Sequence, residues 1–358
     1  MFFSNGRDAI HHVCRTLNFR SGDCVLAPAL ICRSAIEPIT SLGAQVRFVD
    51  VASDLDYDQD LLEAAVTRYR PRCLLAVHHF GRRPRLERYR EFCDRFGSML
   101  IEDRCHSVPA TMDFTDIVGD YAIYSLRKFL PVPDGGILVC RDSGLPLPGD
   151  CGSLSPSDYG RFLLRRFGER LFYSGLCNPY AFRRWRQAAM RWLGGGTPRF
   201  SSEQTAPGEA VAFGPPQRGS SPFLAKWLGG RNLSIVIDRH RRHYRQMAAS
   251  IPAELLCREW DDDMELKSAP IALPIMDTSR DADLVERLRA SGIGAYAWPG
   301  DELPVVVRGR YPEAERLARR LVMLPIHYGL TEADLAYVTS VVRANVSEMK
   351  HGSEYACN

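Results

Sequence analysis

The sequence predicts an α/β fold in which a mostly parallel sheet is sandwiched by helices, followed by a smaller C-terminal α/β unit. Short apolar runs alternate with stretches of helical periodicity from residue 6 to residue 101. Such alternation is typical of parallel strands joined by right-handed crossovers, with helices on both faces of the sheet. The 358 residues are enough for two domains, and 45% hydrophobic with 25% charged residues is ordinary for a globular chain.

The N-terminal part of the chain reads as helices and strands in regular order. Ile10, Val13 and Leu17 recur at helical spacing, so a helix is expected to start almost at the first residue. Short apolar runs bounded by turn residues predict buried strands. Taken in order, helices are predicted at 6–17, 33–42, 58–69 and 85–96, and strands at 24–27, 45–49, 73–77, 99–101, 121–124 and 137–140.

The pattern weakens after residue 140, where a loop rich in Gly, Pro, Ser and Asp is followed by an arginine-bearing helical stretch. We predict a large domain over 1–193, a linker or mobile active-site loop over 194–222, and a small C-terminal domain over 223–358. The small domain is expected to cover the site. Within it we predict helices at 222–251, 282–291, 311–321 and 331–346, strands at 271–274 and 305–307, and a turn at 324–327.

Composition argues against several classes of protein. The formal charge is only +3 and the 46 basic residues are spread among 43 acidic ones, so no nucleic-acid partner is expected. No window approaches the length of a membrane span, so no membrane association is expected. The 11 cysteines are scattered singly, without metal-ligand spacing. We therefore expect free thiols, no metal site and a reducing, cytoplasmic setting.

Lysine is rare in this chain, which uses arginine for most of its positive charge. The lysines are Lys128, Lys226, Lys267 and Lys350. Lys128 follows the predicted strand 121–124, at an edge where ligands collect in parallel sheets. Lysine, unlike arginine, readily loses its proton and attacks a carbonyl as a free amine. Lys128 is therefore a candidate nucleophile.

Other polar side chains follow the predicted strands at the same edge of the sheet. They are Asp50, His78 and His79, Glu102 and Asp103 with His106 just beyond, and Ser125. A turn or helix-capping aspartate explains Asp103 equally well, and for His78 or His106 taken alone a structural histidine is the better explanation. The segment Asn5-Gly6-Arg7 could hold a phosphate on free N–H groups, although a plain helix cap explains it more simply.

Nine ordered motifs together resemble the DegT/StrS family of aminotransferases. The resemblance covers residues 5–140 strongly and the C-terminal part loosely. The motifs are Gly-Arg-x-Ala (6–9), Ser-Gly-Asp-x-Val-x-x-Pro (21–28), Leu-Gly-Ala (42–44), Phe-Val-Asp (48–50), Val-His-x-x-Gly (77–81), Ile-Glu-Asp-x-x-His (101–106), Gly-Asp (119–120), Ser-x-x-Lys (125–128) and Gly-Gly (135–136). Members are fold-type I enzymes that use pyridoxal 5'-phosphate, and many aminate nucleotide-linked keto-sugars.

The resemblance implies a role for particular residues. Lys128 would bind the cofactor as a Schiff base and transfer protons on the substrate. Asp103 would pair with the pyridine nitrogen, because a protonated ring is the electron sink of this chemistry. His106 would lie near the ring hydroxyl. Gly6, Arg7 and Ser125 occupy the family's phosphate-holding positions.

The sequence departs from the family pattern at several positions. Cys32 stands where an aromatic residue commonly stacks on the cofactor ring, so ring stacking is expected to be weaker or to come from elsewhere. Arg7 stands where relatives usually have Thr, and it could hold the phosphate or a substrate carboxylate. The chain begins at the first cofactor helix, so part of the binding surface for a large substrate is expected to be missing.

The leading hypothesis is an aminotransferase that moves an amino group from a donor such as glutamate to a keto acceptor, with a nucleotide-linked keto-sugar as one candidate. A pyridoxal phosphate-dependent lyase and a non-catalytic binding or scaffold protein with the same fold are the alternatives. Lys128 argues against the family's dehydratase branch, in which histidine replaces the lysine. The resemblance also implies a homodimer with active sites between subunits. The identities of donor and acceptor are not readable from the sequence.

Overall fold

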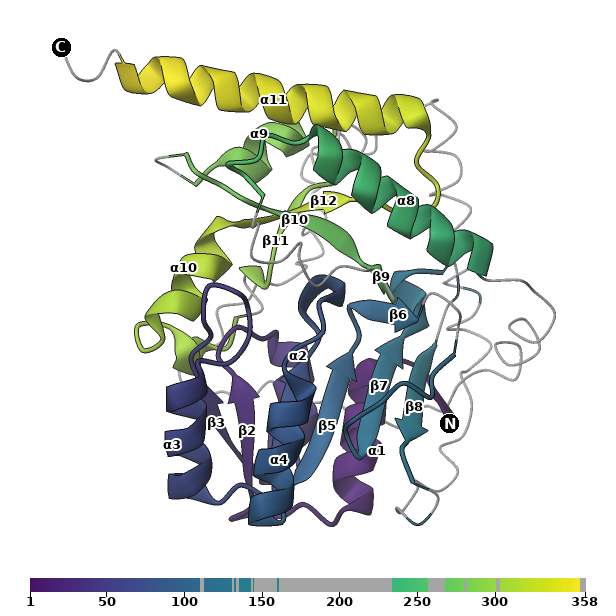
Figure 1. Ribbon diagram of the computed structural model, residues 1–358, viewed down its shortest axis with the longest axis vertical. Coiled ribbons are helices and arrows are strands. Elements are labelled where there is room, and N and C mark those ends of the chain that lie inside the picture. Colours follow the sequence, from purple (N-terminus) through teal and green to yellow (C-terminus); the bar gives the residue numbers. More distant parts are fainter. Residues whose placement is uncertain are drawn as a thin grey trace, which may run out of the picture.

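The computed structural model shows a large sheet with a smaller unit standing at the carboxyl ends of its strands (Figure 1). Helix α11 runs along the far side of the smaller unit and leads to the C-terminus. The structure describes residues 1–109, 113–130, 132, 135–142, 144, 160, 234–256, 268–279, 282–300 and 303–354.

The large sheet has seven strands in the order β1-β8-β7-β5-β4-β2-β3. Strands β3, β2, β4, β5 and β7 are parallel, whereas β8 pairs antiparallel with β7, and β1 antiparallel with β8, at one edge. The predicted α/β class with a mostly parallel sheet is therefore confirmed. The strands are β1 (Phe2–Phe3), β2 (Cys24–Pro28), β3 (Gln45–Val49), β4 (Cys73–Val77), β5 (Met99–Arg104), β7 (Tyr121–Ser125) and β8 (Gly136–Cys140).

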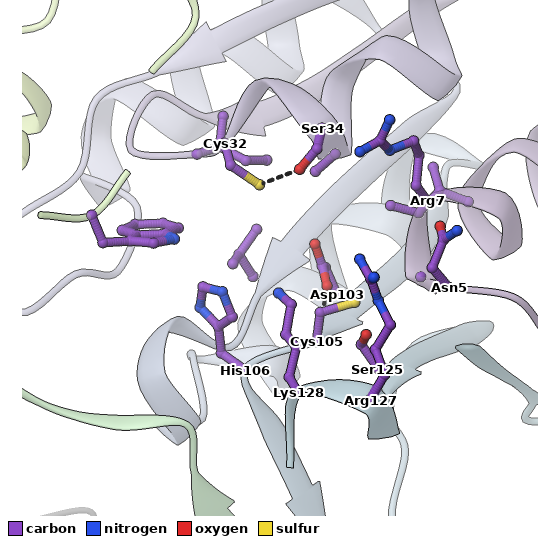
Figure 2. Close-up of a pocket in the computed structure, with 16 residues that line it drawn as sticks. Asn5, Arg7, Cys32, Ser34, Asp103, Cys105, His106, Ser125, Arg127 and Lys128 are labelled. Atoms are coloured by element: carbon purple, nitrogen blue, oxygen red, sulfur yellow. Dashed lines mark hydrogen bonds between the residues drawn. The ribbon is translucent and has the colours of Figure 1, made fainter. Parts of the chain in front are cut away.

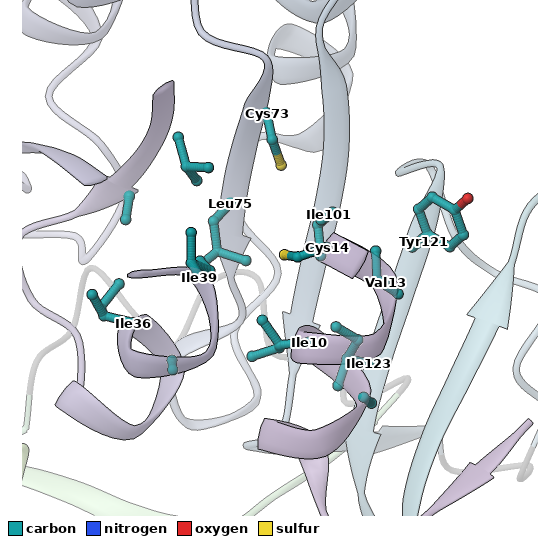
Figure 3. Packing of buried hydrophobic residues seen from close by; sticks show 14 of the residues in the cluster. Ile10, Val13, Cys14, Ile36, Ile39, Cys73, Leu75, Ile101, Tyr121 and Ile123 are labelled. Carbon is teal, nitrogen blue, oxygen red and sulfur yellow. The ribbon is translucent and has the colours of Figure 1, made fainter. Parts of the chain in front are cut away.

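Helices cover both faces of this sheet, as the alternation of elements predicts. Helices α1 (Gly6–Thr16) and α2 (Arg33–Thr40) pack on one face, where Ile10, Val13 and Ile39 meet apolar side chains of β4, β5 and β7 (Figure 3). Helices α3 (Gln59–Tyr69) and α4 (Leu86–Phe96) pack on the other. Two separate cores therefore hold the strand ends in place, because each face of the sheet is buried under its own helix pair.

The smaller unit is a three-stranded antiparallel sheet with helices around it. Its strands, in the order β10-β12-β11, are β10 (Ala272–Met276), β12 (Leu321–Pro325) and β11 (Tyr296–Ala297). Its helices are α8 (Ser234–Ser250), α9 (Leu284–Ala290), α10 (Pro312–Arg320) and α11 (Glu332–Glu354). A short pair, β6 (Ser107–Pro109) with β9 (Ser268–Pro270), ties this unit to the chain that follows β5.

Three local predictions are wrong. The strand predicted at 99–101 continues to Arg104, because the charged side chains that follow are buried and paired. The predicted strand 305–307 is the 3-10 helix η6 (Val305–Val307), in which Val305 is 61% exposed. The predicted turn 324–327 begins inside β12, which pairs with β10. The predicted helical stretch 161–193 and the loop 194–222 lie outside the described residues, and the domain boundaries stay predictions.

Asp50 joins the two units instead of lining the rim of the site where the sequence places it. It follows β3, and its carboxylate accepts hydrogen bonds from the backbone N–H groups of Glu313 at 3.2 Å and Ala314 at 3.0 Å. These groups belong to the first turn of α10, which has unsatisfied donors and a positive dipole end. A carboxylate from the large sheet therefore caps a helix of the smaller unit.

Candidate active site

The seven residues singled out from the sequence line one pocket at the carboxyl edge of the large sheet (Figure 2). They are Gly6, Arg7, Cys32, Asp103, His106, Ser125 and Lys128. Six elements or connections deliver them: the start of α1, the start of α2, β5, the turn after β5, the end of β7 and the 3-10 helix η2 (Leu126–Lys128). Side chains spread over more than a hundred positions meet here because parallel strands end at a common edge.

Lys128 lies in the middle of the pocket. It ends η2, directly after β7, and its side chain is exposed on the open side of the pocket. The Gly-Gly pair at the start of β8 allows this turn to pack closely. A Cβ on Gly135 would come within 3.0 Å of Leu126 Cβ, and one on Gly136 within 2.3 Å of the backbone oxygen of Asn5. The two glycines therefore bring the lysine turn and the start of α1 together.

Asp103 lies close to Lys128 in the pocket view and is 7% exposed. Its Oδ1 accepts the N–H of Cys105 at 3.0 Å, and its carbonyl accepts the N–H of His78 at 2.9 Å. Both its side chain and its backbone are thus held in place. A fixed carboxylate beside an amine can hold a proton on a basic nitrogen of a bound ligand.

The start of α1 forms one end of the pocket, opposite the end where His106 lies (Figure 2). Asn5 caps the helix by accepting the N–H of Asp8 at 3.1 Å. A Cβ on Gly6 would lie 2.4 Å from Cys105 Sγ and 3.9 Å from Ser125 Cβ, so only glycine lets the helix end approach the strands this closely. Arg7 lies at the same end. Backbone N–H groups, a hydroxyl and a guanidinium together form a site suited to a phosphate.

His106 lies on the other side of Lys128. Its Nδ1 is buried and has no hydrogen-bond partner among the residues that the structure describes. Burial lowers the pKa of His106 well below its usual value, and the positive charge of Lys128 lowers it further. The imidazole is therefore neutral at neutral pH. It is stacked on Phe80, with ring centroids 5.7 Å apart and planes inclined by 11°.

Trp298, which follows β11 in the smaller unit, also lines the pocket. Its ring contacts His106 edge-on, with centroids 5.1 Å apart. None of the candidate site residues taken from the sequence lies in the C-terminal part, so Trp298 was overlooked. The signal was the absence of an aromatic residue at Cys32, whose thiol instead lies 3.1 Å from Ser34 Oγ and whose pKa is raised by burial. The aromatic wall of the pocket comes from the smaller unit.

Other polar residues at the strand ends do not line the pocket. His78, His79 and Glu102 are buried, with exposures of 3%, 3% and 0%. Within the described part of the chain, no group of three or more His, Cys, Asp or Glu side chains could hold a metal ion. None of the helices described has the length and apolar character of a membrane span.

The chain is similar to known aminotransferases in sequence and in fold. Residues 1–146 match the DegT/DnrJ/EryC1/StrS aminotransferase family. The N-terminal part of the chain therefore carries the sequence pattern of this family. It is similar, at 24% identity over 348 residues, to a dTDP-4-dehydro-2,3,6-trideoxy-D-glucose 4-aminotransferase from Saccharopolyspora spinosa, and the match covers 94% of this chain and 82% of that one.

Solved structures of the family share the fold. A DegT DnrJ EryC1 StrS aminotransferase from Brucella abortus superposes with a TM-score of 0.63 at 18% identity, over 96% of this chain and 85% of that one. The PLP form of a putative sugar aminotransferase from Streptococcus pneumoniae gives a TM-score of 0.64 at 16% identity, over 98% and 87%. At these identities, the similarity shows that this chain has the same fold as these proteins, and nothing more.

The buried histidines predict that acid destabilises the protein. Burial lowers the pKa of His78, His79 and His240 from 6.5 to about 4. Between these values the unfolded chain binds protons that the folded chain excludes, so the free energy of unfolding falls as pH decreases from 6.5 towards 4. Each histidine contributes at most about 1.4 kcal/mol per pH unit. Denaturant titrations at a series of pH values measure this slope.

A matched variant isolates one of these histidines. His79 Nε2 lies 2.7 Å from the carbonyl oxygen of Leu30, and glutamine in its place can still donate to that oxygen. His79→Gln should therefore reduce the slope by one histidine's share. A free energy of unfolding that does not change between pH 6.5 and 4 would contradict the prediction.

Proposed function

We propose that the protein is a pyridoxal phosphate-dependent aminotransferase that moves an amino group from a donor such as glutamate to the carbonyl of a keto-sugar. The convergence of Lys128, Asp103 and the start of α1 in one pocket carries the proposal. The similarity to a dTDP-keto-sugar aminotransferase favours a nucleotide-linked acceptor. The family match supports amino transfer over a lyase reaction.

The residues of the pocket suit the cofactor at each of its functional groups. Ser125, Arg7 and the close approach at Gly6 would hold the phosphate. Asp103 would face the ring nitrogen. The buried Nδ1 of His106, which has no partner among the described residues, would accept a hydrogen bond from the ring hydroxyl. Trp298 would supply the aromatic contact that Cys32 cannot.

The chemistry follows from these positions. When bound, pyridoxal phosphate supplies a carbonyl that takes up the amino group and a ring that withdraws electrons. Lys128 would anchor the group and, once released, its Nζ would accept the proton from the donor's α-carbon. Asp103 would keep a proton on the ring nitrogen. His106, neutral because of burial, adds no further positive charge to the pocket.

Absorption spectroscopy tests the function directly. Purified apoprotein mixed with pyridoxal phosphate should develop the absorption band of the lysine-bound cofactor, and addition of glutamate or glutamine should convert it to the band of pyridoxamine phosphate. A scaffold protein would bind the cofactor without this conversion. A lyase would consume a substrate without passing the amino group to any keto-sugar. If the band of the lysine-bound cofactor does not develop, the proposed function is wrong.

We further propose a homodimer whose second copy covers the open side of the pocket. Arg7, Arg127 and Lys128 are all exposed in the single chain, although they line the pocket. Arginine is enriched at protein interfaces, so Arg7 and Arg127 on this open surface suit contact with a second copy. Sedimentation velocity measures the oligomeric state, and a monomer that retains full activity would contradict this proposal.

A reducing, cytoplasmic setting and the absence of nucleic-acid and membrane partners stay predictions. The seven cysteines that the structure describes are free thiols, which supports a reducing compartment. Fractionation of the source cells would locate the protein.

A further inference from the structure

A buried polar network lies on the face of the sheet opposite the pocket. Side chains alternate along a strand, so Asp103 points into the pocket while its neighbours Glu102 and Arg104 point to the other face. The same alternation separates Ser125, which lines the pocket, from Tyr124. We call Glu102, Arg104 and Tyr124 the back-face network.

Glu102 is the centre of the back-face network. It is fully buried, and its carboxylate accepts from Arg104 Nε at 2.7 Å and from the N–H groups of Val118 at 2.7 Å and Gly119 at 2.6 Å. His78 Nε2 lies 2.9 Å from the same carboxylate. Burial alone would raise the pKa of Glu102, but these partners lower it to about 2. The carboxylate is therefore ionised and balanced by one guanidinium.

Arg104 extends the network from β5 to β7. Its Nη1 donates to Tyr124 Oη at 3.0 Å, and the two residues face each other in the strand register. This is the last pair between β5 and β7, because β5 ends at Arg104, whereas β7 continues to Ser125 beside β8. The hydrogen bond between Arg104 and Tyr124 therefore connects β5 and β7 at the point where their backbone pairing ends.

The position of this junction has a consequence for the pocket. Asp103 lies directly before Arg104, and Ser125 directly after Tyr124. These two pocket residues would hold opposite ends of one cofactor, the ring nitrogen and the phosphate. Their spacing depends on how β5 and β7 are aligned at their ends. Ordinary structural stability does not require a buried charged pair here, because apolar pairs stabilise sheets at least as well.

We propose that Arg104, Glu102 and Tyr124 are positioning residues that set the spacing between Asp103 and Ser125 to fit a single phosphorylated pyridine ligand. This rests on the proposed function. The network does not touch the ligand. It acts by holding the ends of β5 and β7 in one alignment, so that both ends of the ligand are bound at once.

Two ligands of different length test the proposal. Pyridoxamine 5'-phosphate would contact both Asp103 and Ser125 and forms no covalent link to Lys128, whereas inorganic phosphate would contact only the Ser125 end. Tyr124→Phe removes the acceptor for Arg104 but keeps the ring contact with Phe114, whose centroid lies 4.9 Å away. We expect the dissociation constant for pyridoxamine phosphate to rise about tenfold, and that for inorganic phosphate to change less than about twofold.

Isothermal titration calorimetry of the apoprotein measures both constants. Tyr121→Phe is the matched control, because Tyr121 is a fully buried tyrosine at the other end of β7. It should change neither constant. Arg104→Lys is a second test, because a lysine cannot bridge Glu102 and Tyr124 with a planar fork. Arg104→Lys should show the same selective loss of affinity for pyridoxamine phosphate. If Tyr124→Phe does not fold, Arg104→Lys alone tests the proposal.

The outcomes separate this inference from the function on which it rests. An unchanged constant for pyridoxamine phosphate, or an equal loss for both ligands, would overturn the positioning role and leave the aminotransferase proposal intact. Wild-type protein that binds no pyridoxamine phosphate would overturn both. Thermal unfolding of each apo variant shows whether a selective loss accompanies a general loss of stability, which would also count against positioning.

Discussion

Lys128→Ala should lower the rate of amino transfer by about 10³-fold or more, because one residue would supply both the covalent anchor and the base for proton transfer. The same change should abolish covalent attachment of pyridoxal phosphate. Lys128 is exposed and ends a 3-10 helix, so its truncation leaves the core unchanged. Borohydride reduction followed by mass measurement of the intact chain detects the attachment, and a coupled glutamate assay gives the rate.

Lys350→Ala serves as the control for this prediction. Lys350 lies in α11, the helix that runs along the far side of the smaller unit. Its loss should leave both the covalent attachment and the rate unchanged. If borohydride still couples the cofactor to the Lys128→Ala chain, another amine forms the link and the assignment of Lys128 is wrong.

Asp103→Asn should lower the turnover rate by about 10²-fold or more while the cofactor still binds. The amide keeps the shape of the side chain and its oxygen can still accept the N–H of Cys105, but it cannot hold a proton on a ring nitrogen. The proposed phosphate end, at Gly6 and Ser125, is untouched. The expected pattern is therefore a large fall in kcat with a small change in cofactor affinity.

Asp113→Asn is the matched control, because Asp113 is an exposed aspartate that accepts hydrogen bonds from Thr115. It should leave turnover unchanged, and Asp103→Glu should retain part of the activity because a carboxylate remains. Steady-state kinetics and cofactor titration measure the two effects. Full activity in Asp103→Asn would show that this carboxylate does not hold the proton.

The sequence was sufficient to predict most of the large sheet and seven of the residues that line the pocket. Apolar runs and helical periodicity report burial and secondary structure locally, and in a parallel sheet the strand ends necessarily meet at one edge. For this reason Lys128, Asp103 and Ser125 could be placed together without coordinates. Their catalytic and binding roles are predictions that the experiments above test.

Features that depend on contacts between distant segments were not predictable in this way. The antiparallel direction of β8 and the role of Asp50 as a cap for α10 arise from packing, and the latter joins residues 264 positions apart. Trp298 reaches the pocket only because the smaller unit stands on the strand ends. No local pattern carries that information.

The sequence by itself determined the fold class, the DegT/StrS resemblance and a set of seven pocket residues, because these depend on local periodicity and on the order of motifs. Only the tertiary structure showed that other polar residues at the same strand ends do not face the pocket. Glu102 and Asp103 are adjacent in the chain, yet one is buried behind the sheet and the other lines the pocket. The reason is the alternation of side chains along β5, whose true end at Arg104 the sequence pattern did not reveal.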